Sequence, residues 1–290
     1  MTDRVEVRRT AKLYIGGAFP RSESGRTYEV TAADGRLLAN AARASRKDLR
    51  EAVVAARAAQ PGWAAATAYL RGQILYRVAE LMEGRRAQFE AELADAGAAD
   101  PTRGVNAAID RWVWYAGWSD KIGQVLGNAN PVAGPYFNFS VPEPTGVVGI
   151  VAPADQALLG LVSRLAPAIV SGNTAVVIAS EPHPLPAVSL GEVLATSDVP
   201  GGVVNLITGL RRELVQHLAA HMDVNGLDAY GLDPAQAAAV EELGVENVKR
   251  LVRPPRSGSD AVNWLNERNQ SPYHIAEFVE IKTVWHPIGA

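Results

Sequence analysis

The chain has 290 residues, and its 48% hydrophobic content is ample for a packed core in one large domain or two small ones. Its net charge of −3 leaves no basic stripe for nucleic acid, and no apolar run approaches the roughly 20 residues that span a bilayer. The absence of cysteine excludes disulfides, thiolate metal sites and a cysteine nucleophile. Because the amino terminus lacks the apolar core of a signal peptide, we expect a cytoplasmic protein that binds neither nucleic acid nor membrane.

The first part of the chain predicts short strands followed by a layer of helices. Residues 12–19 and 27–30 are typical of strands that form an entry hairpin. Ser45 and Asp48 predict the start of a helix that ends at Pro61-Gly62. Apolar spacing predicts three further helices, over residues 66–83, over residues 85–96 and after Asp100-Pro101.

The last of these helices carries a cluster of aromatic residues, namely Trp112, Trp114, Tyr115 and Trp118. Such a cluster could stack on a ligand or fill a core. We favour the core, because large aromatic side chains chiefly contribute buried area. Residues 127–134 predict a loop, and the alternation over residues 135–142 predicts an exposed, two-faced strand.

The centre of the chain predicts a strand, a helix and a second strand. Residues 147–151 are β-branched, residues 158–169 repeat apolar side chains at helical spacing, and residues 174–178 form another β-branched run. Gly172-Asn173 ends the helix. Two strands joined in this way lie parallel, and ligands bind at their carboxyl ends, here residues 152–155 and 179–181.

The same alternation continues to residue 252. It predicts strands over 203–207, 227–230 and 248–252, and helices over 186–195, 213–221 and 234–243. This pattern favours an α/β fold with a doubly wound, mostly parallel sheet and an N-terminal helical layer. Beyond it we predict a linker over 253–275, with two helical turns over 260–267, and a terminal strand that must pair with another strand.

Several segments resemble a known family. Residues 144–149 (PTGVVG), 172–177 (GNTAVV), 200–205 (PGGVVN) and Thr208-Gly209 are similar, in order and interval, to the cofactor domain of NAD(P)-dependent aldehyde dehydrogenases. The resemblance implies a Rossmann-like domain over 1–252, with an association hairpin near 127–143. It also implies that residues 253–275 replace the catalytic domain and that 276–290 contain the oligomerisation strand, so that the chain is a truncated, degenerate member.

The resemblance also implies that catalysis has been lost. The family's nucleophile is a cysteine, and this chain has none. Asp155 stands where the family has the asparagine that holds the oxyanion, and Pro254 stands at the place of the general base. Asp155 could serve as a base or metal ligand, although we favour a solvated loop carboxylate or a helix N-cap. We therefore assign no catalytic residue.

Cofactor positions are also altered. Ile178 replaces the lysine that holds the adenosine ribose, and Asp233 would compete with a phosphate for the helix amides. Glu181 matches the family's ribose-binding glutamate, either as a ribose contact or as an ordinary exposed carboxylate. With Gly209 and Gly231 it completes the candidate cofactor site. We expect no required cofactor and weak NAD or NADP binding.

The histidines do not predict a metal site. His217 and His221 stand at helical i,i+4 spacing, but without an acidic or third partner a surface helix face is favoured.

The sequence leaves several functions open. The leading hypothesis is a subunit without catalysis of its own, structural or regulatory, that associates with itself or with a full-length aldehyde dehydrogenase. The alternative is a weak NAD(P)-binding module or residual oxidoreductase that uses Glu181, Gly209 and Gly231. An unrelated enzyme around Asp155 and Glu181 has no nucleophile or acid–base pair to support it.

Overall fold

A parallel five-stranded sheet forms the centre of the protein. The computed structural model describes residues 9–254 and 262–289. The sheet has the strand order β10-β9-β6-β7-β8, and its neighbouring strands pair in parallel. These strands are β6 (Val147–Val151), β7 (Thr174–Ile178), β8 (Val204–Ile207), β9 (Gly226–Asp228) and β10 (Arg250–Val252). The predicted α/β class is confirmed.

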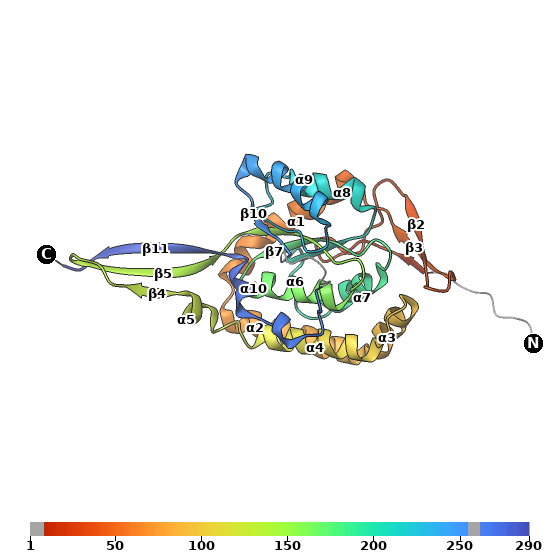
Figure 1. Cartoon of the computed structure of the whole chain (residues 1–290), viewed down its shortest axis with the longest axis horizontal. Helices are drawn as coiled ribbons and strands as arrows, with labels where there is room; N and C mark the ends of the chain where they lie inside the picture. The colour runs from red at the N-terminus through yellow and green to blue at the C-terminus, as the bar shows by residue number, and fades with distance from the viewer. Residues whose placement is uncertain (1–8, 255–261, 290) are drawn as a thin grey trace, which may run out of the picture.

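Helices cover both faces of this sheet (Figure 1). On one face lie α1 (Arg46–Ala65), α8 (Arg211–Ala219) and α9 (Pro234–Gly244). On the other face lie α6 (Leu159–Val170) and α7 (Leu185–Leu194), with α2 (Ala68–Gly84), α3 (Arg86–Asp95) and α4 (Pro101–Ala116) outside them. No helix within the described residues is long and apolar enough to cross a membrane.

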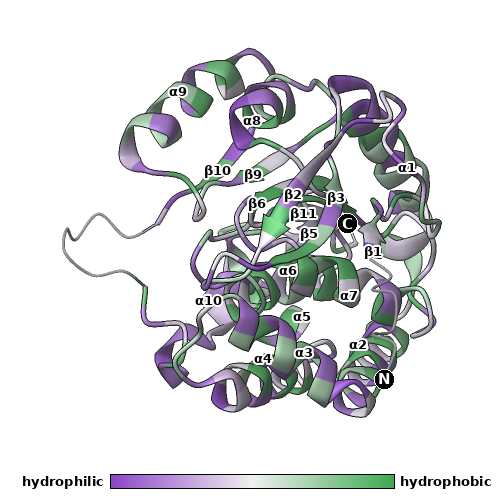
Figure 2. Ribbon diagram, turned by 90° about the vertical axis from the view of Figure 1, so that its right-hand side faces the viewer, coloured by the Kyte–Doolittle hydropathy of each residue, from purple (hydrophilic) through white to green (hydrophobic). Residues whose placement is uncertain are grey.

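The two faces have separate apolar cores because side chains alternate along each strand. Ile150 and Val177 pack toward α6, whereas Val151 and Val176 pack toward α1 and α8. Figure 2 shows hydrophobic residues concentrated in the strands and in the helices against them, and hydrophilic residues mostly on the outer helices and loops.

The predicted central strand–helix–strand unit is confirmed, and Asn173 is the residue that closes it. Its side chain is fully buried, accepts a hydrogen bond from the backbone N–H of Gly146 at 2.7 Å, and donates to the carbonyls of Ala168 (3.0 Å) and Phe278 (2.7 Å). One amide thus joins the start of β6, the end of α6 and a segment more than a hundred residues later in the chain.

The N-terminal region differs from the prediction. It forms a small sheet of β1 (Arg9–Ala11), β2 (Thr27–Thr31) and β3 (Leu37–Ala42), in the order β1-β3-β2. The predicted strand over 12–19 was wrong, since only single bridges occur there, at Tyr14 and Ile15. β3 was not predicted.

Helix α1 begins as predicted but ends later. Ser45 and Asp48 form a capping box at its start. The prediction that Pro61-Gly62 ends this helix was wrong, because α1 continues through Pro61 to Ala65. Its last turn is held against α6 by Trp63, which is 2% exposed and whose indole N–H donates to the carbonyl of Ile169 at 2.8 Å.

The aromatic cluster of α4 lies in the core, which confirms that interpretation. Trp112 and Tyr115 are fully buried, and Trp114 and Trp118 pack against the same core.

A long antiparallel sheet projects from the body as an arm (Figure 1). It contains β4 (Asn128–Asn130), β5 (Tyr136–Pro144) and β11 (Val279–Pro287), in the order β11-β5-β4. The short helix α5 (Ile122–Leu126) leads into it. The predicted strands within 135–142 and 276–285 are confirmed and pair with each other, but the predicted loop over 127–134 contains β4.

The segment before β11 lies on the body. It contains a 3₁₀ turn (η2, Glu267–Asn269) and α10 (Pro272–Ala276). The predicted helix over 260–267 was wrong for 262–266, which are not helical, and its first residues lie outside the described part of the chain. Arg111 of α4 donates to the carbonyls of Trp264 at 2.9 Å and Asn269 at 3.0 Å, which ties this segment to the helical layer.

Candidate functional site

The carboxyl ends of β6, β7 and β9 meet at one edge of the sheet, as the topology requires. There Arg211, the first residue of α8, connects the predicted site residues. Its backbone N–H donates to the carboxylate of Glu181 at 2.8 Å. Its guanidinium donates to the carbonyl of Gly231 at 2.8 Å and to that of Ala152. The structure therefore brings Glu181 and Gly231 together around an arginine that the sequence analysis missed.

The two glycines of the predicted site have structural reasons to be glycine. A Cβ at Gly231 would lie 2.4 Å from the carbonyl oxygens of both Val151 and Ala152, so the turn after β9 packs directly on the end of β6. Gly209 has φ +153°, and its Cβ would lie 3.1 Å from the backbone nitrogen of Ala44.

Asp155 and Ile178 occupy ordinary environments. Asp155 is exposed in the loop after β6, and among the described residues no side chain caps the start of α6. Of the alternatives for Asp155, the solvated loop carboxylate agrees with this placement and the helix N-cap does not. Ile178 is fully buried in the core between the sheet and α1, so its side chain is packed as a hydrocarbon.

Small cavities remain beside this edge. One of about 370 Å³ is lined by Tyr28, Glu181, His183 and Leu210, among others. Another of about 410 Å³ is lined by residues that include Asp155, His183 and Leu265. Burial lowers the pKa of His183, which favours its neutral form.

A buried cation, Arg164, lies at the other part of the edge. Arg164 of α6 is fully buried and donates to Asp228 and Glu277, each at 2.6 Å. Its guanidinium lies 4.0 Å from the centre of the Tyr230 ring. The ring of Trp264, from the segment before β11, lies 5.8 Å from Tyr230. This segment thus covers the end of β9.

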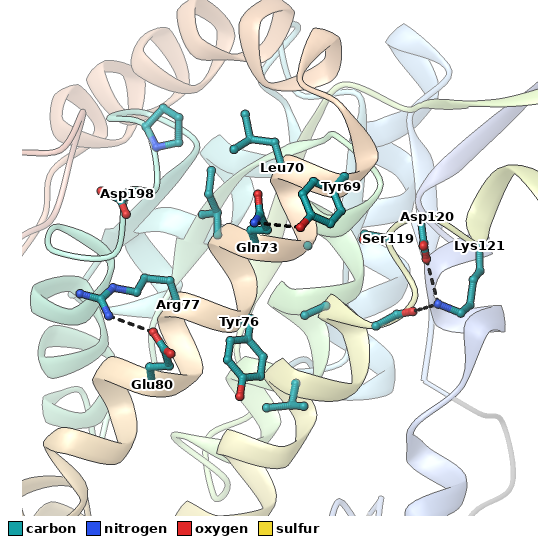
Figure 3. A pocket seen from close by; sticks show the side chains of 16 residues that line it. Tyr69, Leu70, Gln73, Tyr76, Arg77, Glu80, Ser119, Asp120, Lys121 and Asp198 are labelled. Carbon is teal, nitrogen blue, oxygen red and sulfur yellow. Dashed lines mark hydrogen bonds and ion pairs between the residues drawn. The ribbon is translucent and has the colours of Figure 1, made fainter.

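A separate groove of about 980 Å³ lies between α2 and α4 (Figure 3). Its walls include the exposed side chains of Tyr69, Tyr76 and Val113, and Arg77 pairs with Glu80 of the same helix at 2.9 Å. It contains none of the predicted site residues.

The histidine pair forms no metal site in the part of the chain that the structure describes. His217 lies in α8, whereas His221 follows its end and accepts a hydrogen bond from the backbone N–H of Asp223 at 3.2 Å. No group of three His, Cys, Asp or Glu side chains suited to a metal occurs among those residues.

Comparison with known proteins identifies the family. The model of the aldehyde dehydrogenase family matches residues 19–253. The chain belongs to the aldehyde dehydrogenase family. It is similar to aldehyde dehydrogenase DhaS of Bacillus subtilis (strain 168), with 35% identity over 234 residues, covering 78% of this chain and 47% of that protein. Human retinal dehydrogenase 2 is 31% identical over 259 residues, covering 86% and 49%.

Solved structures of this family share the fold. HpcC from Thermus thermophilus superposes with a TM-score of 0.78 at 29% identity, covering 84% of this chain and 47% of HpcC. PnpE in complex with nicotinamide adenine dinucleotide gives a TM-score of 0.75 at 28% identity, covering 83% and 50%. The chain therefore spans about half the length of these relatives.

The polar groups at the sheet edge have partners within the protein. Glu181 accepts a backbone hydrogen bond, the carbonyls of Ala152 and Gly231 accept from Arg211, and the turn at Gly231 packs on β6.

Proposed function

We propose that this member of the aldehyde dehydrogenase family has no catalysis of its own and serves as an association subunit. It forms a homo-oligomer or joins a full-length aldehyde dehydrogenase, in a structural or regulatory role. The observation that carries this proposal is the arm. It is a three-stranded sheet that projects from the body, and both of its faces carry exposed apolar side chains.

The apolar side chains of the arm gather on each face. On one face the rings of Phe137 and Phe139 lie 5.3 Å apart. On the other face Tyr136 and Trp285 lie 5.8 Å apart in an edge-on arrangement, and Ile281 shares that face. Trp285 is 59% exposed and Ile281 53% exposed. Because contiguous exposed apolar patches mark interaction surfaces, these side chains support contact with another chain.

The free edge of β11 adds hydrogen-bonding capacity. The backbone N–H of Thr145 donates to the carbonyl of Phe278, and the backbone N–H of Ile288 donates to the carbonyl of Pro135. In an antiparallel pair with this register, even-numbered residues of β11 face β5, so residues 281, 283 and 285 direct their backbone groups to the free edge. An exposed strand edge is a template for pairing with another strand.

The absence of catalysis rests on the chemistry of the residues. The sequence has no cysteine to act as the thiolate nucleophile of the family. By resemblance, Pro254 replaces the general base, and Asp155 replaces a side-chain amide that would donate to an oxyanion. Neither residue can perform the role that it replaces.

Light scattering coupled to size exclusion tests the association. We expect the wild-type chain to be an oligomer, or to co-purify with a co-expressed full-length relative. The double variant Ile281→Lys/Trp285→Lys places two charges on one face of the arm, and we expect it to be monomeric and to lose co-purification. Met222→Lys, at a residue that is 62% exposed in the loop after α8, serves as the matched control and leaves association unchanged.

A wild-type chain that is monomeric at micromolar concentration, and that co-purifies with no full-length relative, overturns this proposal. The alternative of a weak nucleotide-binding module retains Glu181 as its best ligand. Calorimetric titration with NAD and NADP decides it, and affinity weaker than millimolar removes it.

A further inference from the structure

We propose that Arg211 is a built-in occupant of the crevice at the carboxyl ends of β6, β7 and β9, where it contacts Glu181, Gly231 and Ala152, and that its side chain is what excludes a dinucleotide from this chain. The resemblance places a cofactor in this crevice, but the contacts observed there are made by the protein itself. The inference concerns the sheet edge alone and does not depend on the association proposed for the arm.

Arg211 connects three segments of the chain by hydrogen bonds. Its backbone N–H lies at the start of α8, where such groups have no acceptor within the helix, and it donates to Glu181, which follows β7. Its guanidinium extends across the edge to the carbonyl of Gly231 after β9 and to that of Ala152 after β6. A single residue thus links the ends of three neighbouring strands.

The ends of β6 and β9 are closely packed beside Arg211. The turn at Gly231 lies so close to β6 that even a Cβ would overlap two carbonyl oxygens. The Nε atom of Arg211 is enclosed, with no hydrogen-bond partner among the described residues. The guanidinium is therefore partly enclosed by the protein.

The charges argue against an anion as the natural ligand of Arg211. Its two terminal nitrogens are committed to carbonyl oxygens, so a phosphate would have to break these hydrogen bonds. The carboxylates of Glu181 and Asp155 lie near enough to act on the guanidinium and would repel a phosphate. The same carboxylates stabilise Arg211 in its charged form.

Titration of variants with NAD tests the proposal. Arg211→Ala removes the side chain from the crevice, and Arg212→Ala removes the neighbouring, exposed arginine of the same helix as a matched control. We expect wild type and Arg212→Ala to give no calorimetric signal and no rise in Tm at millimolar NAD. We expect Arg211→Ala to bind NAD at least tenfold more tightly than wild type, and to show a rise in Tm with NAD.

The outcomes separate clearly. Micromolar NAD affinity of the wild-type chain shows that Arg211 is no obstacle and overturns the proposal. A folded Arg211→Ala variant that binds NAD no better than wild type overturns it as well. Should Arg211→Ala fail to fold, Arg211→Gln, which retains one donor for a carbonyl, replaces it in the same titration and is judged by the same two criteria.

Discussion

Arg164 is a fully buried charge, and it depends on two carboxylates. Although burial lowers the pKa of its guanidinium, Asp228 and Glu277 raise it above its ordinary value, so the side chain stays charged. A buried ion pair adds little net stability compared with an apolar pair, but removing one partner leaves an uncompensated charge. Asp228, with no exposed side-chain surface, has Arg164 as its ionic partner.

We expect Arg164→Met to lower the free energy of unfolding by about 3–5 kcal/mol, because it leaves the buried carboxylate of Asp228 unpaired. Urea unfolding followed by circular dichroism measures this loss. Arg212→Met, at an exposed position, is the control and changes the stability by less than about 0.5 kcal/mol. A loss below about 1 kcal/mol for Arg164→Met contradicts the interpretation of Arg164 as the compensating charge.

Lys249 gives the protein a pH dependence on the alkaline side. Its ammonium group donates to the carbonyls of His221 (3.0 Å) and Val224, and burial lowers the pKa of the side chain to about 8, from an ordinary value of 10.5. Between these two values the unfolded chain binds more protons than the folded chain, so stability rises as the pH increases from about 8 toward 10.5.

We expect Lys249→Met to remove this rise. The measurement is the difference in Tm between wild type and variant as the pH is raised from about 7 to about 10. Taking the difference cancels the titration of the tyrosines, which both proteins share. A constant difference over this range shows that Lys249 does not titrate there.

At the scale of the elements, the sequence predicted best where apolar periodicity was strong. The bounds of β6 and β7 agree with the prediction because each is a short run rich in β-branched residues that begins shortly after a glycine. Helix α1 passes Pro61 because Trp63 is anchored on α6, a tertiary contact that local propensity does not contain. β4 was missed because Asn128-Ala129-Asn130 lacks apolar alternation, and the side chain of Asn130 instead bonds Asn138 and Ser140 of β5.

The candidate site was predicted in part, for a similar reason. Glu181 and Gly231 were found through their order in the chain, and they lie at the same edge of the sheet. Arg211 and Arg164 were missed, since their partners lie 20 to 113 residues away in the sequence. The signals available were a cation two residues after Gly209 and a lone arginine within an apolar helix.

Asn173 supplies a test of how the elements are joined. We expect Asn173→Ala to cost about 1–3 kcal/mol for each buried backbone group that it leaves unpaired, among them those of Gly146, Ala168 and Phe278. Urea unfolding measures the total. Asn173→Asp retains an acceptor for Gly146 but lacks the two donors, so hydrogen exchange at the Gly146 amide should be faster in Asn173→Ala than in Asn173→Asp. Equal exchange in both variants contradicts the assigned hydrogen bond.

At the scale of the whole molecule, the body and the arm differ in what they leave uncovered. The segment that contains Trp264 and α10 packs on α4 and α6, and it covers the end of β9. The arm lies apart from the body and carries exposed apolar side chains on both faces. No segment of the described chain covers it in a comparable way. This contrast favours the arm over the sheet edge as the surface that binds a partner.

The pairing of β11 with β5 also sets an order for folding during synthesis. Pro144 pairs with Val279, so β5 leaves the ribosome well before the strand that completes it. Closing so long a loop is slow, and all five strands of the central sheet precede β11 in the chain, so the sheet can form first. Until β11 arrives, β5 keeps an apolar, unpaired edge of the kind that chaperones bind and that promotes aggregation. The arm can therefore be completed only after β11 has been synthesised.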